Sequence, residues 1–330
     1  MSLPPFWLVV MGLERRLAKR QSGIMAAIDL PSVARPTDRP VRQPAKAACL
    51  AVMGMGIIGV VDNVMPEVAR HIGIAQFHIV RSSMALCIIV PLLMARGGLW
   101  PVNPWGVLGR SMLMTLGMGL YFVCVGFLPV AQVLAGVFTA PLWVMVVTLL
   151  RGHRVEPMAA LLIVMGFAGC VAVVQPSVTT LNWLSLGPLG AGFFYGMGGL
   201  VTRSWTGRES VWTLTGAYLA LFGLAAVLWL AVQPDGGTGY LTRGWVAMPW
   251  HVVLFCALQA LAAVFAVALL ARAYQLAAPA YVGAFEYTVL IVAAGVGFSV
   301  WGHALNGLAI FGVIVILASG AALAALGDRA

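Results

Sequence analysis

The segment PVAQVLAGVFTAPLWVMVVTLLRGH, from Pro129 to His153, carries no charged side chain before Arg151. An α-helix needs about 20 apolar residues to cross a hydrocarbon layer of about 30 Å, because lipid offers no partner for backbone N–H and C=O groups. The segment therefore predicts a membrane-spanning helix. Pro141 lies in the middle of it and lacks the N–H group of a helix hydrogen bond, so we expect exposed carbonyl groups at this point.

Similar apolar stretches fill the chain from Ala47 to Leu326, and together they predict ten membrane-spanning helices. The expected spans are residues 47–65, 76–95, 104–125, 129–150, 157–174, 186–202, 211–232, 246–271, 278–300 and 304–325. The composition agrees, because 62% of the residues are hydrophobic and only 9% are charged, whereas about a quarter of the residues in a soluble domain are charged. The sequence excludes a soluble core of this size and predicts an all-α integral membrane protein.

The basic residues predict how the chain is oriented. Of the 19 Lys and Arg residues, eight precede the first span and seven fall in even-numbered loops or at the C-terminus, while only Arg70 and Arg243 fall in odd-numbered loops. Because cytoplasmic loops are enriched in Lys and Arg, both termini are expected in the cytoplasm. The enrichment of Lys and Arg on the cytoplasmic side thus explains the net charge of +9. No nucleic-acid partner is expected.

Residues 1–46 differ in kind from the rest of the chain. An apolar run from Leu3 to Leu13 is followed by basic residues and then by a proline-rich stretch, without the small-residue cleavage site of a signal peptide. We expect a disordered, basic cytoplasmic tail that begins with a short interfacial segment. The alternative is that an upstream translation start adds a segment with no folded role.

The segment APAYVGAFEYTVLIVAAGVGFSVWGH, from Ala278 to His303, matches the Pro129–His153 segment in its very short preceding loop and its final Gly-His. This similarity predicts an internal repeat, although chance similarity between two apolar segments is the alternative. Each half then holds five spans, and an odd number forces the two halves into opposite orientations. We expect a first repeat at 47–175, a second at 186–325 and a short cytoplasmic C-terminus at 326–330.

With these features the chain resembles the drug/metabolite transporter superfamily, specifically its ten-helix EamA-type exporters, over residues 47–325. The resemblance is carried by Arg81, the PVAQ segment (Pro129 to Gln132), Pro141, the APAY and FEYT segments (Ala278 to Tyr281 and Phe285 to Thr288), and the spacing of Gly302, Gly312 and Gly320. It implies export of small metabolites, prominently amino acids, across the bacterial inner membrane through a central cavity walled by both repeats. The family usually ends its fourth and ninth spans with Gly-Glu, whereas this chain has Gly-His at His153 and His303.

Few ionisable side chains lie within the expected spans, and such groups usually face a protein interior or a wet cavity. Asp62 and Arg81 are expected at similar depth, so we predict an ion pair between them, with a direct substrate contact as the alternative. Arg110 lies near the cytoplasmic end of its span, from where its long side chain can reach the membrane surface. Glu286 has no cation at its depth, which makes it a candidate for binding a substrate ammonium group or a coupling proton. A structural, hydrogen-bonded carboxyl group is the alternative.

Helical spacing places further polar and aromatic side chains on faces that are expected to point inward. Together with the charged candidates, the expected substrate-binding residues are His78, Arg81, Gln132, Thr139, Trp143, Tyr195, Gln259, Tyr281, Glu286 and Tyr287. Packing of small and polar residues between helices is the alternative for several of them. A mostly aromatic, weakly polar lining favours hydrophobic or aromatic amino acids over sugars and phosphates.

The sequence contains no recognisable enzyme motif, and its five cysteines lack CxxC spacing, so no catalytic residue, cofactor or metal ligand is expected. We predict a secondary transporter that exports amphipathic small molecules, above all hydrophobic or aromatic amino acids, by alternating access. Its partners would be membrane lipid, the substrate and, as a candidate coupling ion, the proton. The alternatives are a transporter of a larger nucleotide- or flavin-like metabolite, disfavoured because only one arginine is expected in the cavity, and a passive channel.

Overall fold

The computed structural model describes residues 43–95, 100–128, 130–176, 186–233, 237–302 and 305–327. Over these ranges the chain forms helices and their connections without any β-strand, which confirms the predicted all-α class. Three expected features lie wholly or largely outside the described residues, namely the tail up to residue 42, His303, and residues 328–330 of the short C-terminus.

The first half of the chain contains α2 (Pro44–Val61), the 3-10 turn η1 (Asp62–Val64), α3 (Met65–His71), α4 (Ile74–Ala95), α5 (Pro104–Val125), α6 (Val130–Val137), α7 (Ala140–Leu150) and α8 (Pro157–Val174). The second half contains α9 (Leu186–Ser204), α10 (Val211–Ala231), α11 (Trp250–Leu276), α12 (Pro279–Glu286), α13 (Thr288–Trp301) and α14 (Gly307–Gly327).

Nine helical segments in the described part of the chain are long and apolar enough to cross a membrane, which supports a multi-pass membrane protein. They match nine of the ten expected spans. The expected span at 186–202 does form a helix, α9, but α9 is not among the nine because its sequence is rich in glycine and ends in Thr-Arg-Ser. The count of ten spans therefore stays a prediction.

Two of the spans are interrupted near their middle. In the first, α6 ends at Val137 and α7 begins at Ala140, with Phe138 and Thr139 in a turn directly before Pro141. In the second, α12 and α13 are separated at Tyr287, where the Thr288 hydroxyl donates to the Phe285 carbonyl group at 2.7 Å. A proline or a side chain that bonds a backbone carbonyl group interrupts the regular helix hydrogen bonds.

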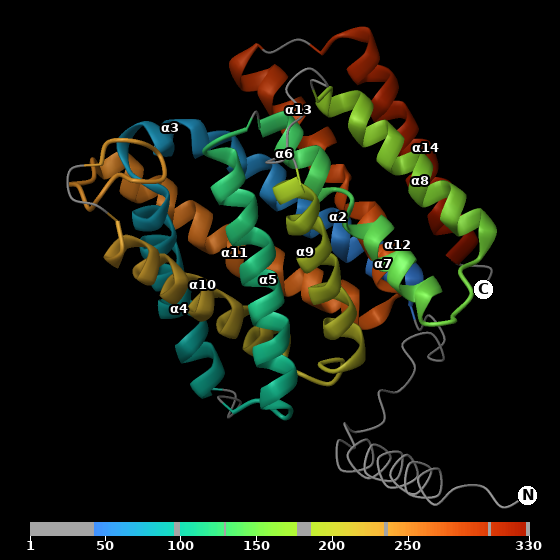
Figure 1. The fold of residues 1–330 in the computed structure, drawn as a ribbon, viewed down its shortest axis with the longest axis horizontal. Helices are drawn as coiled ribbons and strands as arrows, with labels where there is room; N and C mark the ends of the chain where they lie inside the picture. The colour runs from blue at the N-terminus through green and yellow to red at the C-terminus, as the bar shows by residue number, and fades with distance from the viewer. Residues whose placement is uncertain are drawn as a thin grey trace, which may run out of the picture.

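The helices pack in pairs that join the two halves of the chain. Helix α4 packs along α10, α8 along α14, α5 along α9 and α2 along α11. In addition, α9 lies against the interrupted helix α6/α7, and α2 lies against the interrupted helix α12/α13. Figure 1 shows α8 and α14 side by side at one edge of the bundle, with the other helices beside them.

Glycines permit the close crossing of α8 and α14. A Cβ atom added at Gly312 would lie 2.6 Å from the carbonyl oxygen of Gly169, and one added at Gly169 would lie 2.9 Å from that of Gly312. Membrane helices associate through such close backbone contacts because lipid provides no hydrophobic driving force between them.

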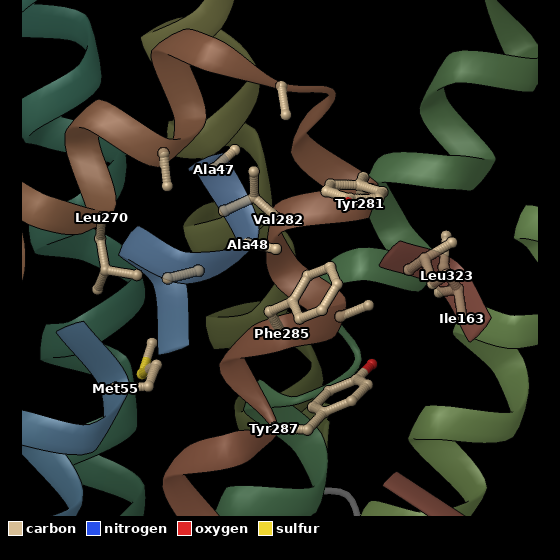
Figure 2. Close-up of a cluster of buried hydrophobic side chains, with 14 of the residues drawn as sticks. Ala47, Ala48, Met55, Ile163, Leu270, Tyr281, Val282, Phe285, Tyr287 and Leu323 are labelled. Atoms are coloured by element: carbon tan, nitrogen blue, oxygen red, sulfur yellow. The ribbon is translucent and has the colours of Figure 1, made fainter. Parts of the chain in front are cut away.

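A large cluster of buried hydrophobic side chains (Figure 2) reaches from the middle of the bundle to the end at which α2 begins and α11 stops. It joins Ala47 and Ala48 at the start of α2 with Leu276 at the end of α11 and with Val282 and Phe285 of α12. Because α2 leads into α3 and α11 follows the 237–249 connection, this end is opposite to the one that carries α3. We refer to the two ends as the closed end and the α3 end.

The crossing of α8 and α14 yields a test of the packing. Gly312→Ala is expected to lower the thermal unfolding midpoint of the purified protein in detergent, since overpacking against a rigid backbone costs about 1–3 kcal/mol. Gly295→Ala in α13 is the matched control, because a Cβ atom there meets no atom within 4 Å. The control is expected to leave the midpoint unchanged or slightly higher, as Ala favours a helix by about 1 kcal/mol over Gly. Equal midpoints for the two variants would contradict the close crossing.

Candidate substrate-binding site

A cavity of about 630 Å³ lies inside the bundle. Its lining residues come from α2 to α7 and from α9 to α13, while α8 and α14 contribute none. At the α3 end the lining reaches Pro66 and Ala69 of α3 and Tyr240 of the connection between α10 and α11. Leu270 and Tyr287 belong both to the lining and to the hydrophobic cluster of the closed end, so this cluster forms the floor of the cavity.

The polar part of the lining is rich in tyrosine and balanced in charge. The lining contains two acidic residues, Asp62 and Glu286, and two basic ones, Arg81 and Arg110. Six of the seven tyrosines of the chain also line the cavity, namely Tyr121, Tyr195, Tyr218, Tyr240, Tyr274 and Tyr287. The remaining lining is mostly apolar. Such a surface provides aromatic faces together with hydroxyl groups that both donate and accept hydrogen bonds.

Glu286 occupies the last position of α12, directly before the interruption at Tyr287. Its Oε1 atom accepts hydrogen bonds from the Tyr274 hydroxyl at 2.7 Å and from the Tyr195 hydroxyl at 3.3 Å. The side chain is 5% exposed, so these two donors stabilise a carboxyl group that is almost fully buried. The interruption of the helix thus places a carboxyl group at the cavity wall, between α9 and α11.

Arg110 is 2% exposed and is one of the largest fully enclosed side chains of the protein. Its Nε donates to the Thr202 hydroxyl at 2.9 Å, and its Nη1 donates to the Leu214 carbonyl oxygen at 3.0 Å. The expectation that Arg110 reaches the membrane surface is therefore wrong. Its guanidinium group bonds to residues of α9 and α10. To reach the membrane surface, Arg110 would have to lie on an exposed face of α5, and it does not.

Asp62 and Arg81 both line the cavity, but the expected ion pair between them is not formed among the described residues. Asp62 lies in the η1 turn and accepts from Gln259 Nε2 at 3.2 Å, and the same nitrogen donates to the Val61 carbonyl oxygen at 3.0 Å. The guanidinium carbon of Arg81 lies 5.4 Å from the ring centroid of Phe77 and 5.9 Å from that of Phe222. Asp62 therefore has a polar partner on α11, whereas the guanidinium group of Arg81 lies over aromatic rings of α4 and α10.

The two helix interruptions meet beside the cavity. The Tyr287 hydroxyl donates to the Phe138 carbonyl oxygen at 3.1 Å, and the two rings pack edge to face with their centroids 5.7 Å apart. Gly283 of α12 lies so close to Pro141 that an added Cβ atom would be 2.9 Å from its ring. One interruption thus satisfies a carbonyl group that the other leaves outside its helix.

Five of the ten predicted site residues lie together on the lining: Arg81, Tyr195, Gln259, Glu286 and Tyr287. The other five lie elsewhere. The Thr139 hydroxyl donates to the Gly136 carbonyl oxygen at 2.5 Å, and Trp143 packs edge to face on Phe193 of α9. Gln132 is buried in α6, and Tyr281 belongs to the cluster of the closed end.

The fifth of these residues, His78, is enclosed by aromatic rings. Its ring centroid lies 4.9 Å from that of Phe77, 4.4 Å from that of Phe122 and 4.5 Å from that of Phe222. Neither ring nitrogen has a hydrogen-bond partner among the described residues. His78 shares a helical stripe with Arg81, but these rings separate it from the cavity.

The predicted set of site residues lacks six polar residues of the lining: Asp62, Arg110, Tyr121, Tyr218, Tyr240 and Tyr274. Arg110 was already visible as an arginine within a span. Tyr274 was lost because the expected span ended at residue 271, whereas α11 continues for 27 residues to Leu276. Because α11 is longer than a helix needs to be to cross the membrane, it extends the cavity wall by more than one turn beyond the expected span.

No known protein-family profile matches the chain. A protein of Rhizobium johnstonii described as a riboflavin transporter is 30% identical over 219 residues, which make up 66% of this chain and 68% of that protein. This chain therefore belongs to the same family as that protein, and it is a membrane transporter. The relationship also favours a transporter over an enzyme.

The fold has a counterpart among solved structures. The crystal structure of another protein superposes with a TM-score of 0.69 and 15% sequence identity, covering 87% of this chain and 98% of that one. At this identity the similarity shows the fold alone.

The contact between the two interruptions can be tested by removing one hydroxyl group. Tyr287→Phe is expected to lower the thermal unfolding midpoint in detergent, since an unsatisfied buried carbonyl group costs about 1–3 kcal/mol. Tyr121→Phe is the control, because Tyr121 also lines the cavity but makes no side-chain hydrogen bond to the described residues. If both variants unfold at the wild-type temperature, the Tyr287 bond does not stabilise the interruptions.

Proposed function

We propose that this protein is a secondary transporter of a flavin-like metabolite of the size of riboflavin. The observation that carries the proposal is the 30% identity to a protein described as a riboflavin transporter. It favours the flavin-like alternative over the hydrophobic or aromatic amino acids that the sequence had suggested. The cavity also supports the flavin-like substrate, because its lining contains two arginines where only one was expected.

The cavity suits an uncharged, planar aromatic molecule with polar edges. Its volume of about 630 Å³ falls within the range of about 300–1,000 Å³ that is usual for small-molecule sites. Tyrosine and phenylalanine rings could pack against the faces of a flavin ring, while arginine and glutamine side chains could bond its carbonyl and N–H edge. Because two acidic and two basic residues balance each other, the lining favours a neutral flavin over a phosphorylated one.

The guanidinium group of Arg110 is already held in place for a contact with a flavin. Its bonds to Thr202 and Leu214 use Nε and Nη1, which leaves the Nη2 group for a ligand. A guanidinium group that is already fixed loses little side-chain entropy when it binds. Glu286 is fixed in the same way by two tyrosines.

We also propose that the chain consists of two inverted repeats of five spans, 47–175 and 186–325, that move by alternating access. The packing of the helices supports this proposal. In such a repeat, each helix of the first half corresponds to the helix at the same place in the second half. The counterpart of the α5–α9 contact is then the α11–α2 contact, and the counterpart of α9 against α6/α7 is α2 against α12/α13. The α4–α10 and α8–α14 pairs exchange with themselves. Transport proteins with inverted repeats place their substrate near the contact of the halves.

The distribution of Lys and Arg supports a location in the bacterial inner membrane with both termini in the cytoplasm. In this orientation the α3 end faces outward, and the hydrophobic floor of the cavity separates it from the cytoplasm. Membership in the EamA-type branch of the drug/metabolite transporters, the direction of export and the use of protons belong to the same proposal.

Counterflow in liposomes tests the substrate. Liposomes that hold the purified protein and unlabelled riboflavin are expected to accumulate labelled riboflavin saturably, while protein-free liposomes do not. Flavin mononucleotide is expected to compete weakly, since its phosphate adds charge to a balanced cavity. Saturable exchange of tryptophan or phenylalanine without any exchange of riboflavin would restore the amino-acid prediction. Flux that never saturates would indicate a channel.

Substitution of Glu286 tests the polar wall of the cavity. Glu286→Gln keeps an oxygen acceptor for Tyr195 and Tyr274 but removes the charge, so the protein is expected to fold. Riboflavin exchange is expected to fall by about tenfold or more, because a hydrogen bond to a charged group contributes about 1.5–3 kcal/mol. The response of riboflavin exchange to an imposed proton gradient is also expected to disappear in this variant.

Glu156→Gln is the matched control for this substitution. Glu156 caps α8 by accepting from the Ala159 N–H group at 3.0 Å and does not line the cavity. Its substitution is expected to leave exchange unchanged. Wild-type exchange and pH response in Glu286→Gln would remove Glu286 from the mechanism.

A further inference from the structure

Two histidines and a glutamate lie together at the α3 end, outside the cavity lining. They are Glu67 and His71 of α3 and His251 at the start of α11. One potential ligand atom from each residue lies within 4.8 Å of the other two. The side chains come from helices that are far apart in sequence, so the fold creates this cluster.

Glu67 and His71 are four residues apart on one helix and therefore share a face. Arg70 donates to Glu67 Oε2 at 2.7 Å, which leaves Oε1 toward His71 at 3.7 Å from its Nδ1. The Nδ1 atom lies 3.0 Å from the Glu67 carbonyl oxygen. A metal-binding histidine usually donates one ring N–H to such an oxygen and binds the metal with its other nitrogen.

His251 completes the cluster from the second half of the chain. Its ring lies edge to face with that of His71, with 5.1 Å between the centroids. Trp250 and Phe255 also contact the His251 ring edge to face, each with centroids 6.1 Å apart, which restricts its orientation. The side chains of Glu67 and His71 are about one-third exposed, so an ion can reach them from solution.

We propose that Glu67, His71 and His251 bind a divalent transition-metal ion, best represented by Zn²⁺. Two imidazoles and one carboxylate form a donor set that Zn²⁺ accepts, with the fourth position open to water. Zinc bonds of about 2.0–2.2 Å bring ligand atoms to about 3.5 Å from one another, so the side chains need to move closer together than the 4.8 Å that now encloses one potential ligand atom of each. The sequence did not suggest this site, because His251 lies 180 residues away from His71.

The position of the site gives it a consequence for transport. Met65, Pro66 and Ala69 of α3 line the cavity, and α11 contributes Gln259 to the same wall. A metal bound by both helices would fasten α3 to α11 at the α3 end of the cavity. If this end changes shape during alternating access, bound Zn²⁺ slows transport. This consequence rests on the proposed function, whereas metal binding itself does not.

The binding of Zn²⁺ is tested by titration calorimetry on the metal-free, full-length protein in detergent, purified without a histidine tag. The wild-type protein is expected to bind Zn²⁺ saturably at the site and to unfold at a higher temperature in its presence. His251→Ala and Glu67→Gln are each expected to weaken binding by at least about tenfold, the loss that even indirect changes around a metal site cause. His153→Ala is the matched control, because it removes an imidazole outside the cluster.

Two results would overturn the proposal. One is the absence of saturable Zn²⁺ binding to the wild-type protein, which would leave the cluster as ring packing and an ion pair. The other is wild-type affinity in both variants, each shown by size-exclusion chromatography to be folded. Counterflow with and without Zn²⁺ then tests the effect on transport: slowing is expected in the wild type and in His153→Ala, but not in His251→Ala. A failure of counterflow itself would concern the substrate and leave the binding result unaffected.

Discussion

Backbone groups that leave their helix must find partners inside a membrane protein, because lipid supplies none. The two interrupted helices of this transporter meet that constraint together. The Tyr287 hydroxyl bonds the Phe138 carbonyl group, and Thr288 bonds that of Phe285. The same interruption ends α12 at Glu286 and so exposes a carboxyl group to the cavity. The arrangement of the site therefore follows from how the interruptions are stabilised.

Three of the charged side chains around the cavity obey the same constraint. Arg110 is held by α9 and α10, Glu286 by tyrosines of α9 and α11, and Asp62 by Gln259 of α11. Each of these bonds joins two different helices, so the walls are fixed before a ligand arrives. The acidic and basic residues of the lining balance in number, which is the basis for proposing a neutral ligand. The hydrophobic floor closes one end, and α3 with the nearby histidines borders the other.

Hydropathy predicted nine of the spans because the requirement for about 20 apolar residues acts locally. It also predicted a helix at 186–202, where α9 lies, but the glycines that permit close packing lower the hydropathy of α9, which is not among the nine. Half of the predicted site residues lie on the lining, because helical spacing identifies a polar face but not its neighbour. His78 shows this limit, as three phenylalanine rings enclose it. The partners of Arg110 come from distant helices, which a single sequence does not reveal.

The central claim is that a neutral flavin binds in the tyrosine-lined cavity. Equilibrium titration of the purified protein with riboflavin, followed by the fluorescence of the flavin, tests this claim without any assumption about direction or coupling. We expect saturable quenching at one flavin per chain, because stacking on aromatic rings places the flavin beside tyrosine. Quenching is expected to be weaker in Tyr218→Phe combined with Arg81→Met. Unquenched riboflavin at protein concentrations that bind an aromatic amino acid would contradict it.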